Sequence, residues 1–168
     1  CNFRCPMCAW GNPQIEKIKK SEMDMPMDLY SDALKNISEC TNKVGLSDTG
    51  EFMAERNWKE RIKIIVEKAK ENPNLMFHQI TNASLLTKKN LSHLRGIKRV
   101  TFLISIDGNE FLTYSTIRTP GSLYKTLPNI KNLRKNLAEI GVEEVAIQLS
   151  MVLLKRNLFT LPSMIDLA

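Results

Sequence analysis

Three cysteines at the start of the chain have a spacing that indicates metal chemistry. Cys1, Cys5 and Cys8 follow the pattern C-x3-C-x2-C, and thiolates on so short a loop can converge on one iron–sulfur cluster. A 4Fe–4S cluster has four irons, so three cysteines leave one iron without a protein ligand. Catalytic metal sites keep such an open position, whereas structural sites are closed. The triplet therefore predicts a 4Fe–4S cluster with one iron free to bind another molecule.

Two other readings of the cysteines stay open at this point. Cys40 is a possible fourth ligand, although it falls near the end of a predicted amphipathic helix, where a buried free thiol is ordinary. A closed cluster would indicate an electron carrier or a cluster-binding regulator. Zinc would indicate a small interaction module, but no further His or Cys stands near the triplet to complete a zinc site.

Polar residues and glycine stand where three predicted strands end. Thr49, Gly50 and Glu51 follow the strand at 43–47, Thr81 and Asn82 end the strand at 75–81, and Ser105 and Asp107 end the strand at 99–106. In parallel α/β barrels the active site lies at the carboxyl ends of the strands. Three such strand ends together predict one shared polar site.

The elements that would position this site alternate along the chain. Strands are expected at 43–47, 75–81, 99–106 and 145–152, and helices after Pro26, over 53–71, after a Ser84 cap, over 122–140 with Pro128 starting or kinking the helix, and after an Asn157 cap. Strands that alternate with helices predict an α/β fold with a parallel sheet and right-handed crossovers. No linker divides the chain, so residues 1–168 are expected to form one domain.

Composition narrows the class of protein. The apolar fraction of 43% and the charged fraction of 25% are those of an ordinary globular domain. The net charge of +6 is spread along the chain, so nucleic acid is not an expected partner. Neither an apolar run of the ~20 residues that span a membrane nor a signal-peptide pattern is present. A tight cysteine cluster favours a reducing compartment, so we expect the protein to be cytoplasmic.

Taken together, the motifs resemble the radical S-adenosylmethionine (radical SAM) superfamily. The triplet is similar to its cluster motif, Thr49-Gly50-Glu51 to its Gly-Gly-Glu segment, residues 81–86 to its Thr-Asn-Gly-x-Leu-Leu turn, and Ser105-Ile106-Asp107-Gly108 with Arg118 to the segment after its fourth strand. The resemblance covers almost the whole chain in the family's order. The chain departs from the family pattern at Thr49, where Gly is common, and at Phe52, where Pro is common.

The resemblance implies a role for each of these residues. Cys1, Cys5 and Cys8 would hold the cluster, Met7 would lie near adenine, Thr49, Gly50 and Glu51 would face the amino group of S-adenosylmethionine, Arg118 would pair with its carboxylate, and Ser105 and Asp107 would hold its ribose. The implied cofactors are a 4Fe–4S cluster and S-adenosylmethionine.

The resemblance also implies an activity and a complete fold. The chain would be an oxidoreductase or maturase that reductively cleaves S-adenosylmethionine to a 5′-deoxyadenosyl radical. The radical would take hydrogen from a peptide, protein or small-molecule substrate, with electrons from a donor such as flavodoxin or ferredoxin. The family fold is a partial parallel (β/α)6 TIM-like barrel, and members with a similar Ser-Ile-Asp-Gly segment carry a C-terminal SPASM-type extension.

The chain begins at a cluster cysteine, so we expect a radical SAM core domain truncated at both ends, without the first and last strands. Such a fragment is expected to expose apolar strand edges and to aggregate.

Overall fold

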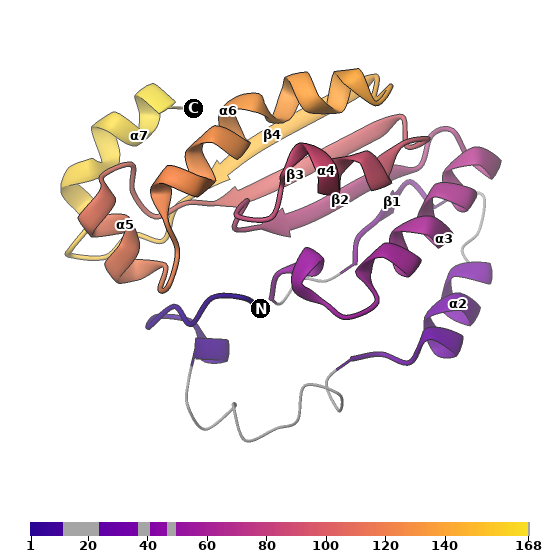
Figure 1. Ribbon diagram of the computed structural model, residues 1–168, viewed down its shortest axis with the longest axis horizontal. Coiled ribbons are helices and arrows are strands. Elements are labelled where there is room, and N and C mark those ends of the chain that lie inside the picture. Colours follow the sequence, from indigo (N-terminus) through magenta and orange to yellow (C-terminus); the bar gives the residue numbers. More distant parts are fainter. Residues whose placement is uncertain (12–23, 37–40, 47–49, 168) are drawn as a thin grey trace.

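A four-stranded, all-parallel sheet organises the computed structural model, which describes residues 1–11, 24–36, 41–46 and 50–167. The strands are β1 (Lys43–Val44), β2 (Met76–Thr81), β3 (Arg99–Ser105) and β4 (Glu144–Ser150), and they lie side by side in chain order (Figure 1). The predicted α/β class and parallel sheet are confirmed.

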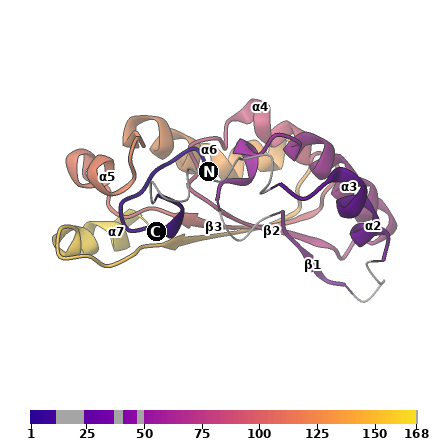
Figure 2. The same ribbon diagram turned by 90° about the horizontal axis from the view of Figure 1, so that it is seen from below.

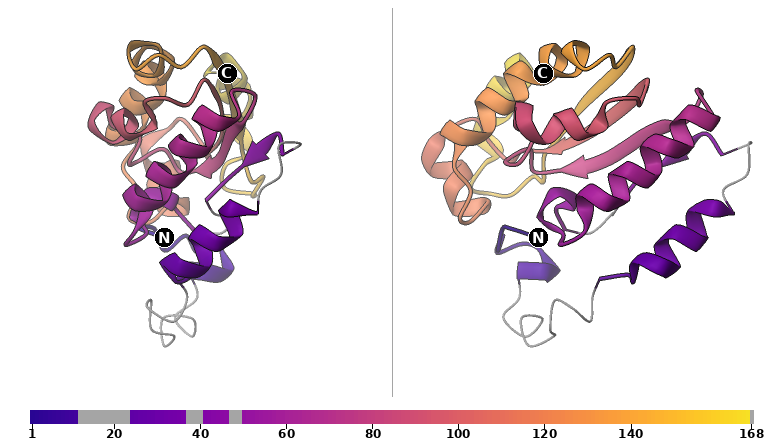
Figure 3. Two further views of the ribbon diagram at one scale, coloured as in Figure 1. Left: turned by 90° about the vertical axis from the view of Figure 1, so that its right-hand side faces the viewer. Right: turned by 45° about the vertical axis from the view of Figure 1, so that its right-hand side comes forward.

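Helices connect the strands. They are α2 (Met27–Lys35), α3 (Trp58–Glu71), α4 (Lys88–Leu91), α5 (Phe111–Ile117), α6 (Leu123–Glu139) and α7 (Leu161–Leu167), with 3-10 turns at Ala9–Gly11, Phe52–Ala54, Ser92–Leu94 and Leu158–Thr160. Figure 2 shows α3, α4 and α6 on one face of the sheet. Helix α2 lies alongside α3 (Figure 3), where Arg61 stacks 4.9 Å above the ring centroid of Tyr30. Among the described residues, no helix is long and apolar enough to cross a membrane.

The core lies between the sheet and these helices. Side chains of a strand alternate between its two faces, and on the helix-covered face Phe77, Val100, Phe102 and Ile104 are buried. Phe77 contacts Phe102 edge to face, with ring centroids 6.2 Å apart, a favoured geometry for aromatic pairs. The alternating residues His78, Ile80 and Leu103 are half-buried, so the opposite face of the sheet is less covered.

The register brings the carboxyl ends of the strands to one edge of the sheet. Thr81 at the end of β2 pairs with Ile104 of β3, and Ser105 at the end of β3 pairs with Ser150 at the end of β4. In Figure 1 the arrowheads of β2, β3 and β4 point toward the end of the molecule where the N-terminal loop and α5 lie.

Three predicted helix starts differ from the structure. Ser84 does not cap a helix; Thr87 does, since its hydroxyl accepts a hydrogen bond from the N–H of Asn90 at 3.2 Å, and α4 begins at Lys88. The helix predicted over 53–71 begins at Trp58, after a 3-10 turn. Asn157 precedes a 3-10 turn and makes no side-chain cap.

The long helix matches its predicted range, because α6 covers Leu123–Glu139 with Pro128 inside it. Pro128 therefore does not start the helix. Helix α5, which was not predicted, begins after Glu110, whose carboxylate accepts the N–H of Thr113 at 2.9 Å.

We expect Phe102→Ala to lower the free energy of unfolding by about 3–5 kcal/mol, the usual cost of truncating a fully buried aromatic side chain, since Phe102 is 0% exposed. Phe159, which is 67% exposed, provides the matched control, and Phe159→Ala should cost under ~1 kcal/mol. Urea denaturation of both variants measures the difference. Equal losses in the two variants would show that the core is not where the sheet places it.

Candidate functional site

The three cysteines line one cavity together with residues from the strand ends. Its volume is about 150 Å³, and its walls include Cys1, Cys5, Cys8, Gly50, Thr81, Asn82, Ser105 and Arg118. These residues come from the N-terminal loop, the segment after β1, the ends of β2 and β3, and the end of α5. The structure thus brings together the cysteine triplet and the predicted polar strand ends.

The cysteine loop has a compact backbone. The N–H of Cys8 donates to the carbonyl of Cys5 at 3.0 Å, and the N–H of Gly11 donates to the carbonyl of Cys8 at 2.9 Å. A Cβ atom at Gly11 would lie 2.3 Å from the carbonyl oxygen of Cys5, so this turn has room only for glycine. The turns leave Cys1 and Cys8 exposed and Cys5 buried.

Three polar side chains tie this loop to the end of β2. Asn82 donates to the Oδ1 of Asn2 at 2.9 Å, Asn2 donates to the hydroxyl of Ser84 at 2.9 Å, and Ser84 donates to the Oδ1 of Asn82 at 2.6 Å. Neither Asn2 nor Ser84 was predicted to belong to the site. The position of Asn2 between the first two cysteines could have indicated that its side-chain amide belongs to the site.

The other side of the loop packs on the segment after α5. The N–H of Arg4 donates to the carbonyl of Thr119 at 2.6 Å. A Cβ atom at Gly121 would lie 2.9 Å from the ring of Phe3, so glycine allows this close approach. The cysteines are therefore held between β2 and the segment that carries Arg118.

Glu51 is the most deeply buried carboxylate on the β2 side of the site. It is 3% exposed. The hydroxyl of Thr81 donates to its Oε1 at 2.8 Å, and the N–H of Asn82 donates to its Oε2 at 2.7 Å. Burial raises the pKa of Glu51 from 4.5 to about 7, and these hydrogen bonds oppose the rise. Its proton occupancy therefore changes near neutral pH.

Of the other two residues in the predicted Thr49-Gly50-Glu51 segment, the structure describes Gly50. Gly50 has a φ of +92°, a left-handed conformation that favours glycine, and it lines the cysteine cavity. Thr49 lies outside the described residues. In the turn after β2, Ala83 has a φ of +59°, a conformation that glycine adopts without strain.

Asp107 and Arg118 form a buried ion pair next to the cysteines. The Nε of Arg118 contacts the Oδ2 of Asp107, and the Oδ1 of Asp107 accepts the N–H of Val152 at 2.8 Å. Asp107 is 0% exposed and does not line the cavity, whereas Ser105 and Arg118 do. Of the two predicted ribose ligands, the structure brings Ser105 to the cavity and directs Asp107 to Arg118.

Asn157 fixes the segments that leave β3 and β4. Its side-chain amide donates to the carbonyls of Asp107 at 3.0 Å and Val152 at 2.8 Å, and its Oδ1 accepts the N–H of Leu154 at 2.8 Å. The side chain predicted as a helix cap therefore joins two strand exits instead.

Charge and burial act in opposite directions on the thiol of Cys5. Burial raises its pKa, the guanidinium of Arg118 lowers it, and the nearby Cys8 raises it. Metal ions bind the thiolate, so a cation beside Cys5 favours the binding form.

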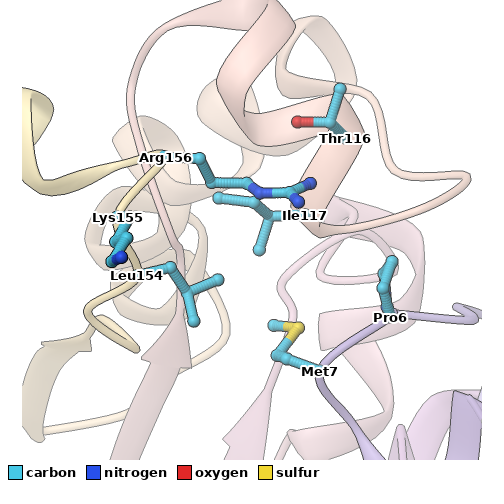
Figure 4. A pocket seen from close by; sticks show the side chains of 7 residues that line it. All are labelled: Pro6, Met7, Thr116, Ile117, Leu154, Lys155 and Arg156. Carbon is cyan, nitrogen blue, oxygen red and sulfur yellow. The ribbon is translucent and has the colours of Figure 1, made fainter.

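A second and larger cleft lies beside the cysteine loop. Its volume is about 580 Å³, and it is lined by Pro6, Met7, Thr116, Ile117, Leu154, Lys155 and Arg156. Figure 4 shows the side chains of Met7, Ile117 and Leu154 directed toward a common space, with the side chain of Arg156 extending across it. Met7 therefore lines this neighbouring cleft rather than the cysteine cavity. The cleft has an apolar floor and two cations at its rim.

Within the described ranges, no group of three His, Cys, Asp or Glu side chains is arranged around a single metal ion. A zinc ion needs all its ligands within about 2.3 Å of one atom, whereas the cysteines of a 4Fe–4S cluster bind different irons and can stand further apart. In comparisons with known proteins, no family model and no curated protein matches the chain.

Glu51 predicts a pH dependence of stability. Its folded-state pKa of about 7 lies above the ordinary 4.5, so between these values the folded protein holds a proton that the unfolded chain releases. The free energy of unfolding should therefore fall by about 2.5 kcal/mol as pH rises from 5 to 8. Urea denaturation across this range measures the fall.

The variant Glu51→Gln should flatten this dependence, because its amide does not titrate. The exposed Glu60 provides the control, and Glu60→Gln should keep the full pH dependence. A wild-type curve that is parallel to that of Glu51→Gln between pH 5 and 8 would contradict the raised pKa.

Proposed function

We propose that this chain is the core of a radical SAM enzyme. The observation that carries the proposal is the shared cavity: Cys1, Cys5 and Cys8 line it together with Gly50, Ser105 and Arg118. A zinc module or a closed electron carrier has no use for an arginine, a serine and a left-handed glycine facing its metal ligands.

The donor set fits a 4Fe–4S cluster with an open iron. Thiolates are the usual ligands of such clusters, and the cavity offers three of them, two exposed and one buried. The walls that complete it include a guanidinium, hydroxyls and a side-chain amide, from Arg118, Ser105, Thr81 and Asn82, which are groups that recognise an amino acid. When bound, the cluster would supply the electron that cleaves S-adenosylmethionine, and the resulting 5′-deoxyadenosyl radical would take hydrogen from the substrate.

The chain's own residues would bind and orient S-adenosylmethionine. Arg118 would pair with its carboxylate, since guanidinium suits two-point recognition of a carboxylate. Gly50 would let the backbone approach the amino group. Glu51 does not line the cavity, but its carboxylate lies behind Thr81 and Asn82 and would attract that group through its charge. Ser105 would donate to or accept from the ribose hydroxyls.

The larger cleft would take the adenine. Met7, Ile117 and Leu154 offer it an apolar floor, and Met7 also belongs to the cysteine loop, so adenine there would stay close to the cluster. Binding in this cleft would exclude water from the reacting end of the molecule.

The open parallel sheet would be part of a partial (β/α)6 barrel. Two observations support this: the strands follow chain order, and helices α3, α4 and α6 cover one face of the sheet, as they do on the outside of a barrel. The substrate, a peptide, protein or small molecule, would approach from the less covered face. The electron donor would be a protein such as flavodoxin or ferredoxin in the cytoplasm.

Anaerobic reconstitution tests the proposal directly. The purified protein, supplied with iron, sulfide, a strong reductant and S-adenosylmethionine, should form 5′-deoxyadenosine, measured by chromatography. Cys1→Ala, Cys5→Ala and Cys8→Ala should each abolish the product and most of the bound iron, because three ligands leave little redundancy. Cys40→Ala should retain both.

A reconstituted cluster that yields no 5′-deoxyadenosine would contradict the proposal and favour the electron carrier. If Cys40→Ala also loses its bound iron, as the other three cysteine variants do, the site is a closed one with four cysteine ligands.

Glu51→Gln should weaken the binding of S-adenosylmethionine about tenfold, because it removes a buried negative charge whose attraction for the amino group is worth ~1.5 kcal/mol. Equilibrium dialysis of the reconstituted protein measures the affinity, and the visible absorption of the cluster should be unchanged. Glu60→Gln is again the control. Loss of the cluster in Glu51→Gln would contradict the role of Glu51 in binding the amino group.

A further inference from the structure

We propose that Asp107 is a positioning residue for Arg118, and that Ser105 carries the contact with ribose without it. The inference rests on the proposed function, because Arg118 acts there on the carboxylate of S-adenosylmethionine. It changes the role that the sequence resemblance implies for Asp107.

Burial and hydrogen bonding leave Asp107 no access to a ligand. Its side chain is 0% exposed, its Oδ1 accepts the N–H of Val152 at 2.8 Å, and its Oδ2 contacts the Nε of Arg118. A ribose hydroxyl would have to displace one of these partners from the interior. Ser105 stands two residues earlier and does line the cysteine cavity.

Arg118 is held where a ligand in the cavity can meet it. Its side chain is 13% exposed, and it lines the same cavity as Cys1, Cys5 and Cys8. A guanidinium is planar and carries five N–H groups. Contact between Asp107 and the Nε atom therefore fixes the plane of the guanidinium, and its remaining N–H groups can donate to the carboxylate of a ligand.

Asp107 is itself held from two directions, so it can fix Arg118 with little freedom. The N–H of Val152, just beyond β4, holds its carboxylate, and the side-chain amide of Asn157 holds its carbonyl at 3.0 Å. Arg118 is anchored at its own backbone, where its N–H donates to the carbonyl of Tyr114 at 2.8 Å. Both ends of the pair are thus attached to rigid elements, and such support keeps a binding group within the narrow tolerance that recognition requires.

The pair also makes a buried cation tolerable before any ligand binds. An unpaired guanidinium in this cavity would carry a large desolvation cost, and a buried partner offsets it. Arg118 can therefore stay inside the site in the absence of S-adenosylmethionine, already aimed at the place of its carboxylate.

Two ligands separate this role from contact with ribose. S-adenosylmethionine and 5′-methylthioadenosine share adenine and ribose, but 5′-methylthioadenosine has no carboxylate. In the reconstituted protein, Asp107→Asn should weaken S-adenosylmethionine about tenfold, the loss that follows from one misaligned charge-assisted hydrogen bond. It should leave the affinity for 5′-methylthioadenosine unchanged. Ser105→Ala, the control for ribose contact, should weaken both ligands.

The outcomes of this binding experiment are distinct. Equal weakening of both ligands in Asp107→Asn would overturn the positioning role and support ribose contact or general damage to the fold. Unchanged binding of both would overturn it as well. If the wild-type protein with a complete cluster does not bind S-adenosylmethionine, the proposed function fails, and the positioning role fails with it.

A second measurement tests the ion pair without cluster or ligand. Urea midpoints are compared for Asp107→Asn, Arg118→Gln and the double variant. Because each single change strands a buried charge, the midpoint of the double variant should fall by less than the sum of the two single falls. Additive falls would mean that Asp107 does not hold Arg118, and would overturn the inference even if S-adenosylmethionine binds.

Discussion

The site depends on the hydrogen bonds among Asn2, Asn82 and Ser84, because they attach the cysteine loop to the end of β2. The loop is short and most of its side chains are polar or sulfur-containing, so hydrophobic burial alone cannot fix it. Each amide or hydroxyl in this set bonds to another member, which satisfies polar groups that would otherwise be costly to bury. The packing of Phe3 against Gly121 fixes the opposite side. The position of the loop is therefore set by two contacts, one with the end of β2 and one with the segment after α5.

The parallel register then determines which residues can share the site. Once β2, β3 and β4 are aligned, the residues that follow each strand reach the same edge, and helix α5 returns Arg118 to that edge from a position 13 residues after Ser105. The buried pair of Asp107 and Arg118 holds the end of α5 next to the end of β3. Asn157 connects the segments that leave β3 and β4. Fold and site are thus stabilised by the same interactions, so damage to one is expected to affect the other.

The sequence was informative where structure is set locally and less so where it is set by contacts between distant segments. The bounds of β2, β3 and the long helix were predicted to within one residue from periodicity and turn residues, whereas β1 and β4 end before the predicted residues 47 and 152. The grouping of Gly50 with Ser105 followed from a parallel sheet, and Arg118 was assigned by the motif resemblance. The pairing of Asp107 with Arg118 was not predicted, because a carboxylate at a strand end looks the same whether it faces a ligand or an arginine. Ser84 resembled a helix cap for a similar reason: its hydroxyl is taken by Asn82 and Asn2, a choice that depends on a loop 82 residues away.

The shortness of β1 has a consequence for motion in the molecule. Among the described residues of this edge, Lys43 and Val44 are the two that pair with β2, so few ladder hydrogen bonds resist its opening. The contacts of Glu51 with Thr81 and Asn82 supplement that pairing from a point further along the chain. Regions with few such interactions open at a lower free energy than the core. The pairing of β1 with β2 should therefore open at a lower free energy than the pairing of β2 with β3, which extends from Met76 to Thr81.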